Sequence, residues 1–150
     1  MKITRNEIVA VAKKPYKLVG EETVDDIDYQ SWIDFIESHK NLFVWYEETT
    51  EGKDILYNID KVPEWAKERV LYTLSKKRAL ASEELMKTPT DLVISYSESD
   101  KRISVSLEKN LNKKTGKLIL EMAKHLDALM LVDGKKIIDE KMIDSLPQLV

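Results

Sequence analysis

"DLVISYSESDKRISVSL", residues 91–107, carries the clearest strand pattern in this sequence. Apolar and polar residues alternate on both sides of Ser99-Asp100, as they do in an antiparallel hairpin with one buried and one solvated face. Pairing across this turn places six side chains on the face expected to be buried: Leu92, Ile94, Tyr96, Ile103, Val105 and Leu107. The other face holds Val93, Ser95, Ser97, Arg102, Ser104 and Ser106. The stretch therefore predicts an antiparallel hairpin that covers a core on one side only.

A second hairpin is predicted in "NLFVWYEETTEGKDILYNID", residues 41–60, with a two-residue loop at Glu51-Gly52 or a four-residue loop from Thr50 to Lys53, which give the same faces. In that register three pairs share a face that we expect to be buried: Val44 with Ile59, Tyr46 with Tyr57, and Glu48 with Ile55. A one-residue change in loop length would exchange the two faces.

The opposite face of this predicted hairpin is a candidate contact surface, made of Phe43, Trp45, Glu47, Leu56, Asn58 and Asp60. Large aromatic side chains with a polar rim are typical of surfaces that bind other proteins. In the alternative interpretation, residues 1–40 cover Trp45 within the chain, since apolar side chains are usually buried by their own protein.

Three helices are expected around the hairpins. Asp25, Asp26 and Asp28 precede the first, whose apolar stripe is Tyr29, Trp32, Ile33 and Ile36. The second and longest is predicted in "VPEWAKERVLYTLSKKRALA", residues 62–81, with Pro63 in its first turn. The third is predicted in "KKTGKLILEMAKHLDA", residues 113–128, with the stripe Leu118, Ile119, Met122, Ala123 and Leu126. Leu120 lies off this stripe, so we expect it to contribute less than half as much stability as Ile119.

Both ends of the chain carry shorter signals. Thr4 and Glu7 have the spacing of a capping box, which predicts a short helix up to Pro15, with a strand as the alternative. Near the other end, "LMLV" and "KIID" predict two strands that meet across Asp133-Gly134, a strong hairpin signal. The order of elements predicts an α+β fold with a largely antiparallel sheet, built from hairpin-helix units with helices on one face. No break in composition divides residues 1–150, which predicts a single globular domain.

Composition narrows the classes of function. The 150 residues include no cysteine, which excludes disulfides and thiol catalysis. Residues 1–75 carry 10 Lys/Arg against 15 Asp/Glu, whereas residues 76–150 carry 14 against 12, and neither half has the strong basic field that generic nucleic-acid binding requires. No apolar run is long enough for a bilayer span and the first residues lack a signal-peptide core, so we expect a soluble, cytoplasmic protein without membrane association.

The sequence predicts no catalytic residue, cofactor site or metal site. His39 and His125 are expected to be structural or surface residues, because no partner for acid–base work stands near either in sequence. The acidic residues at positions 21, 22, 25, 26 and 28 lack the glycine and distal glutamate of a calcium loop, and helix capping explains the aspartates. The lysines of "KKTGK", residues 113–117, lack phosphate-loop spacing and are expected to form a solvated face.

Three functions remain open. The favoured one is a non-catalytic module that binds another protein, with a basic protein as one candidate partner; an inhibitor or immunity-type protein that neutralises a basic toxin or nuclease belongs to this class. The second is a small hydrolase or transferase that uses dispersed carboxylates, for which a pocket with two converging carboxylates would be diagnostic. The third is a structural homodimer subunit that buries its aromatic surface in a symmetric interface.

Overall fold

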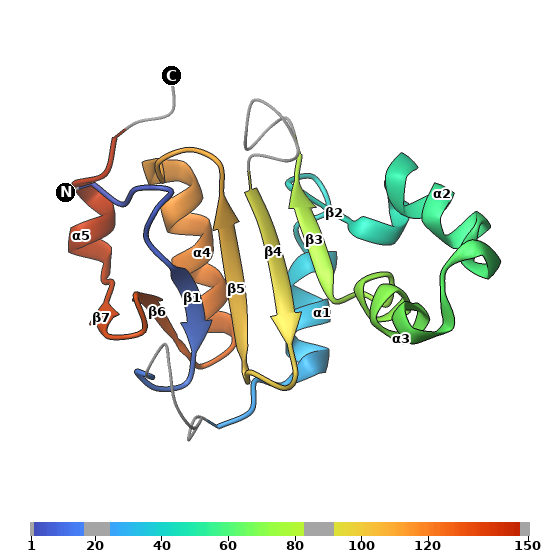
Figure 1. Ribbon diagram of the computed structural model, residues 1–150. Helices are drawn as coiled ribbons and strands as arrows, with labels where there is room; N and C mark the ends of the chain where they lie inside the picture. Colours follow the sequence, from blue (N-terminus) through green and yellow to red (C-terminus); the bar gives the residue numbers. More distant parts are fainter. Residues whose placement is uncertain (1, 17–24, 83–91, 148–150) are drawn as a thin grey trace.

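The computed structural model describes residues 2–16, 25–82 and 92–147, and its main feature is a seven-stranded antiparallel sheet formed by these residues. The order across the sheet is β2-β3-β4-β5-β1-β6-β7. The strands are β1 (Val9–Ala12), β2 (Phe43–Trp45), β3 (Arg78–Ala81), β4 (Leu92–Ser97), β5 (Arg102–Leu107), β6 (Leu129–Val132) and β7 (Lys136–Ile137). Helices α1 (Tyr29–Glu37) and α4 (Lys113–His125) lie side by side on one face of the sheet (Figure 1). The predicted α+β class is confirmed.

The hairpin predicted from residues 91–107 is confirmed in its register. β4 and β5 pair antiparallel, with Leu92 opposite Leu107, Ile94 opposite Val105 and Tyr96 opposite Ile103. Ile94 and Ile103 are fully buried, whereas Ser95 on the other face is partly exposed. Strict alternation over both strands fixes the register, because a slip of one residue would move every apolar side chain out of the core.

The hairpin predicted in residues 41–60 is wrong. β2 ends at Trp45 and is followed by the 3₁₀ helix η1 (Tyr46–Glu48), helix α2 (Thr50–Tyr57) and a second 3₁₀ helix, η2 (Ile59–Lys61). Val44 pairs with Leu80 of β3 instead of Ile59. The cause is local: the Thr49 hydroxyl donates to the Tyr46 carbonyl at 2.6 Å and accepts from the Gly52 N–H at 3.0 Å, which caps a helix where a turn was expected.

The long helix predicted for residues 62–81 is also only half correct. Helix α3 (Glu64–Thr73) begins after Pro63 as expected, but Arg78–Ala81 form β3, and at 13 residues α4 is longer than α3. Ala79 pairs with Trp45 on one side and with Ile94 on the other. Arg, Ala and Leu are good helix formers, yet hydrogen bonding to two neighbouring strands overrides that preference.

The first residues form a strand, which was the alternative to the predicted helix. The four residues of β1 are buried, and β1 lies between β5 and β6. Glu7 does accept a hydrogen bond from the Thr4 N–H at 2.9 Å, but this contact closes a single turn before the strand. β-branched valines that alternate with alanines suit a central strand that is covered on both faces.

The remaining predictions outside the sheet centre are largely confirmed. Asp28 caps α1 by accepting from the Ser31 N–H at 2.9 Å and from its hydroxyl at 2.8 Å, and these bonds lower the pKa of the Asp28 carboxyl. β6 and β7 form the terminal hairpin, with positive φ at Asp133 and Gly134. A short helix that the sequence did not indicate, α5 (Glu140–Asp144), packs beside α4 (Figure 1).

The core lies between the sheet and the layer of α1 and α4. The predicted stripe of α4 is buried throughout, but Leu120, predicted to lie off the stripe, is also only 9% exposed. Leu120 belongs to the same buried cluster as Ile143 of α5, so α5 covers α4 on a second side. The sequence predicted that Leu120 contributes less than half as much stability as Ile119. Because Leu120 is buried, we now expect the two residues to contribute about equally to the free energy of unfolding.

Candidate protein-binding surface

The aromatic part of the predicted contact surface is not exposed. Phe43 and Trp45 are each 1% exposed and belong to the main core. Trp32 of α1 covers Trp45 edge to face, with ring centroids 5.8 Å apart, and the Trp45 Nε1–H donates to Glu37 at 2.9 Å. This hydrogen bond is the main reason that the pKa of the Glu37 carboxyl is lowered. The alternative interpretation, in which residues 1–40 cover Trp45, is the correct one.

The other predicted contact residues separate into two places. Glu47 lies in η1, where its Oε2 accepts from the Lys76 N–H at 2.7 Å, so it joins two parts of the chain instead of facing a partner. Leu56 is 48% exposed at the end of α2, and Asn58 and Asp60 follow it in the connection to α3. Leu56, Asn58 and Asp60 therefore lie together along the chain near the surface, but at the end of a helix and not on the face of a hairpin with Phe43 and Trp45.

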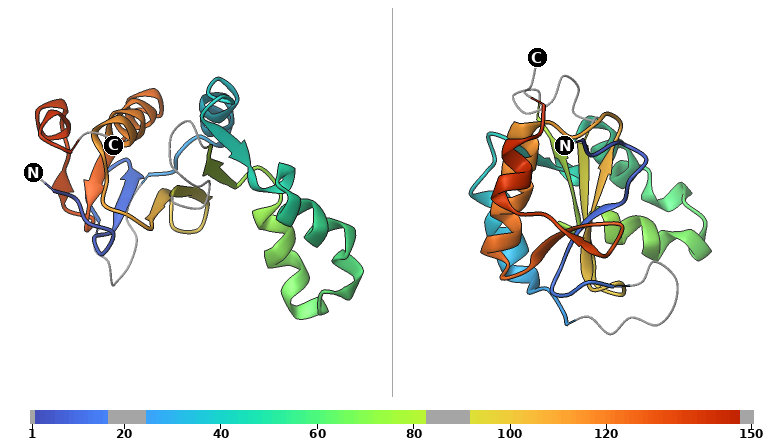
Figure 2. Two further views of the ribbon diagram at one scale, coloured as in Figure 1. Left: turned by 90° about the horizontal axis from the view of Figure 1, so that it is seen from above. Right: turned by 90° about the vertical axis from the view of Figure 1, so that its left-hand side faces the viewer.

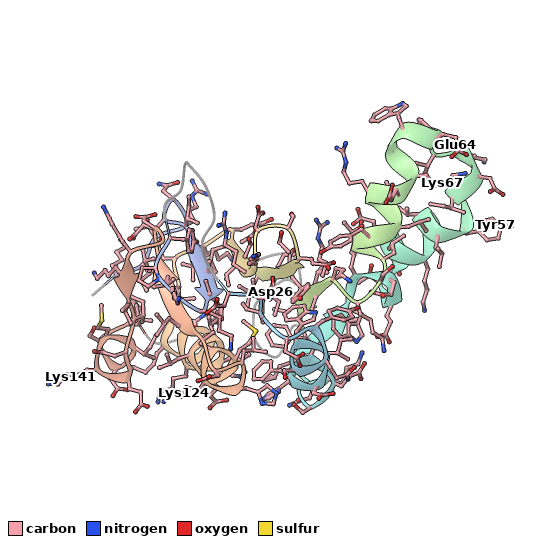
Figure 3. All side chains as sticks on the ribbon, turned by 90° about the horizontal axis from the view of Figure 1, so that it is seen from below. Asp26, Tyr57, Glu64, Lys67, Lys124 and Lys141 are labelled. Atoms are coloured by element: carbon pink, nitrogen blue, oxygen red, sulfur yellow. The ribbon has the colours of Figure 1, made fainter. Side chains whose placement is uncertain are left out.

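Residues 46–75 form a projection that we call the α2–α3 arm. It leaves the sheet after β2, the edge strand, and returns to it at β3. The arm extends outward from this edge, away from the layer of α1, α4 and α5 (Figure 2). The far end of the arm carries Tyr57, Glu64 and Lys67, well away from Lys124 and Lys141 at the opposite end of the molecule (Figure 3).

The base of the arm is held by a small apolar cluster of its own. Its buried members are Tyr46, Leu74 and Leu80, with Val44, Ile55, Val70 and Val93 packed against them. Gly52 lets α2 approach η1 closely, because a Cβ atom at this position would stand 2.0 Å from the Tyr46 carbonyl oxygen. The arm is thus fixed to the sheet at its base. The sheet residues of this cluster lie on the face opposite α1 and α4.

The far end of the arm carries large apolar side chains that nothing in the described chain buries. Tyr57 is 89% exposed and Trp65 is 79% exposed, and Leu56, which precedes Tyr57, is half exposed. No residue of η2 or α3 is buried. Elsewhere the exposed large apolar residues include Ile8 and Ile137, each at 49%. We call Leu56, Tyr57 and Trp65 the arm tip.

The net charge of the protein arises on this projection. Residues 46–75 contain seven Asp/Glu and four Lys/Arg, a net charge of −3, which equals the net charge of the whole chain. The rest of the molecule is therefore balanced. The excess lies at the base of the arm, in Glu47, Glu48 and Glu51, whereas residues 53–69 around the tip carry four Asp/Glu and four Lys/Arg. At the tip, Glu64 pairs with Lys67 at 3.0 Å. The tip therefore joins exposed aromatic rings with charges of both signs.

Tyr57 and Trp65 were not singled out from the sequence, although one signal was present. Val70 of α3 and Leu74, which follows the helix, pack into the base cluster and are four residues apart, and Trp65 stands outside that row. A tryptophan off the apolar stripe of a helix indicates an exposed ring. Tyr57 had no such signal, because it was assigned to the core face of a hairpin that does not form.

The histidines take part in ordinary packing contacts. The His39 ring stacks on Phe35 with centroids 4.2 Å apart, and its Nδ1 lies 2.7 Å from the Phe35 carbonyl oxygen. The His125 ring lies 5.7 Å from the same phenylalanine. Among the described residues, no three His, Asp or Glu side chains are grouped so as to hold a metal ion, and residues 21 and 22 of the acidic cluster lie outside that part of the chain.

The lysine-rich start of α4 is closed by the chain itself. Asn112 caps the helix by accepting from the Thr115 N–H at 2.8 Å, and the Lys113 N–H donates to the Pro147 carbonyl at 2.7 Å. Gly116 is buried against Leu146. These contacts use the N–H groups that would otherwise face an anion.

A shallow cavity of about 370 Å³ lies between α4 and α5. Its carboxylates stand among lysines: Lys117 is 4.0 Å from Asp144, and Lys124 forms an ion pair with Glu140. A hydrolase that uses dispersed carboxylates would need two carboxylates that converge in a pocket and are not paired with lysines. The pKa of one of these carboxyl groups would typically be raised. The carboxyl groups with a clear pKa shift in the described chain, Asp28 and Glu37, are both shifted downward.

Within the described residues, no helix is both long and apolar enough to cross a membrane. Comparisons with protein-family models, with curated proteins and with solved structures gave no match to this chain.

Proposed function

We propose that this protein is a non-catalytic binding module whose partner is another protein, held by the tip of the α2–α3 arm. The observation that carries the proposal is the exposure of Tyr57 and Trp65, at 89% and 79%, on an arm whose helix α3 buries no residue. Tryptophan and tyrosine supply most of the energy in many protein interfaces, because their large rigid rings are desolvated at little cost in conformational entropy.

The charge at the base of the arm supports a partner of opposite sign. Because residues 46–52 carry the arm's net charge of −3, we infer that the partner has an apolar recess for the tip and a basic surface that faces the base of the arm. Opposite charge speeds the encounter, and cations from the partner can stand over the faces of the exposed rings. An inhibitor that covers a basic toxin or nuclease is one role that uses these properties.

The test compares the double variant Tyr57→Ala/Trp65→Ala with wild type and with Ile137→Ala. Ile137 is the matched control, because it is also a large exposed apolar residue but lies on β7, at the far side of the sheet. A partner captured by wild type and identified by mass spectrometry is purified and titrated by calorimetry. We expect the arm variant to bind at least about 30-fold more weakly, corresponding to roughly 2 kcal/mol, with an unchanged unfolding midpoint.

Two results contradict the proposal. If Ile137→Ala weakens binding as much as the arm variant, the contact surface lies elsewhere. If sedimentation shows that wild type forms dimers and that the arm variant is monomeric, the occupant of the tip is a second copy of this chain and the basic partner is excluded.

A further inference from the structure

The segment that joins the arm to β3 is held by side chains of α1. The Ser75 carbonyl accepts from the Tyr29 hydroxyl at 2.7 Å, and the Lys76 carbonyl accepts from the Trp32 Nε1–H at 2.9 Å. Lys76 has a φ of 57°, so the chain bends sharply here without a glycine. Both donors belong to α1, on the covered face of the sheet. Helix α1 therefore holds the joint of the arm directly.

A lysine stands at the centre of this joint. The Lys77 Nζ lies 3.9 Å from the ring centroid of Tyr29, 4.9 Å from that of Tyr72 and 5.8 Å from that of Tyr96. We call these three rings the tyrosine cage. They come from α1, from α3 in the arm and from β4, so one cation joins the helix layer, the arm and the sheet.

The rings of the cage are fixed by their hydroxyl groups. The Tyr72 hydroxyl donates to the Tyr96 carbonyl at 3.2 Å and accepts from the Glu98 N–H at 3.1 Å. The Tyr96 hydroxyl donates to the Ile27 carbonyl at 2.8 Å. Because each ring is anchored to a backbone group, the ring faces are already in place around the cation, and little ordering is required to hold it.

No residue of η2 or α3 is buried, so contacts at the tip do not fix its orientation relative to the sheet. Its direction depends on contacts at the base, and Tyr72 is the residue of α3 that contacts the cage cation. We propose that Lys77 is a positioning residue that sets the orientation of the arm, and through it the placement of Tyr57 and Trp65 toward a partner. This role rests on the function proposed above.

Hydrogen exchange of the α3 amides tests the joint without any partner. Lys77→Gln keeps most of the side-chain length and removes the charge, so we expect exchange in residues 64–73 to become about 3- to 30-fold faster, in proportion to the loss of the cation contacts. Lys77→Arg keeps a cation that stacks on aromatic rings and should stay within about twofold of wild type. Lys76→Gln is the matched control, because the neighbouring Lys76 Nζ pairs with Glu37 at 3.4 Å instead of with the cage.

Binding to the purified partner supplies the second measurement. We expect Lys77→Gln to weaken binding several-fold, Lys77→Arg to restore it, and Lys76→Gln to leave it within about twofold of wild type. Unchanged α3 exchange in Lys77→Gln overturns the proposal, whether or not the tip binds a protein. Faster exchange with wild-type affinity also overturns it, and in that case the proposed function stands while the positioning role does not.

Discussion

Replacing Trp45 by alanine should destabilise this protein strongly, although the sequence pattern suggested an exposed side chain. Trp45 is 1% exposed, its ring packs edge to face on Trp32, and its Nε1–H donates to Glu37. Truncation of a buried tryptophan typically costs about 3 to 5 kcal/mol through lost transfer energy and a cavity. Domains of ordinary stability have about 5 to 15 kcal/mol in total, so the loss is a large part of it.

The assay is a urea titration of Trp45→Ala beside Trp65→Ala, followed by circular dichroism. With a slope of about 2 kcal/mol/M, the midpoint of Trp45→Ala should fall by roughly 1.5 to 2.5 M. Trp65 is 79% exposed, so its replacement should change the free energy of unfolding by no more than about 0.5 kcal/mol. Similar losses in the two variants, or a small loss in Trp45→Ala, would refute the placement of these rings.

Three further changes test other parts of the fold. Gly52→Ala should cost about 2 to 3 kcal/mol in a denaturant titration, because its Cβ would clash with the Tyr46 carbonyl oxygen. Leu120→Ala should cost about 2 to 5 kcal/mol, as much as Ile119→Ala, since both faces of α4 are covered; a much smaller loss for Leu120 would show that α5 does not bury it. Glu37→Gln should lower the urea midpoint at pH 7. Because folding lowers the pKa of the Glu37 carboxyl from its ordinary value of 4.5, its stabilisation is complete above that value and is lost as the pH falls through the folded pKa, so wild type and variant should begin to converge as the pH drops below 4.5.

The features that sequence reasoning predicted correctly share a local origin. The β4–β5 hairpin follows from strict alternation, and α4 from a continuous apolar stripe, so nearby residues determine both. The capping of α1 by Asp28 is equally local. Each of these elements was predictable because its own pattern agrees with its place in the fold.

The failures have a different physical cause. In residues 41–60 the Glu51-Gly52 pair resembles a turn, but the structure uses Gly52 for close approach of α2 to Tyr46. Residues 78–81 have helical propensity and become a strand only because β2 and β4 lie on either side. The candidate surface failed with the hairpin, since its faces were inferred from pairing that does not occur. Leu56, Asn58 and Asp60 remained near the new site because they lie at the end of α2 or after it.

The position of β1 in the sheet has a consequence for synthesis on the ribosome. β1 is made before the other strands, yet it joins β5 and β6, with Val9 opposite both Val105 and Val132. At about 5 to 20 residues per second, roughly 6 to 25 s pass between translation of β1 and translation of β6. Until β5 is made this apolar strand has neither neighbour, and until β6 is made it has only one. Early stages of folding should therefore depend on chaperones that bind extended apolar segments, and the sheet can close only after β6 has been made.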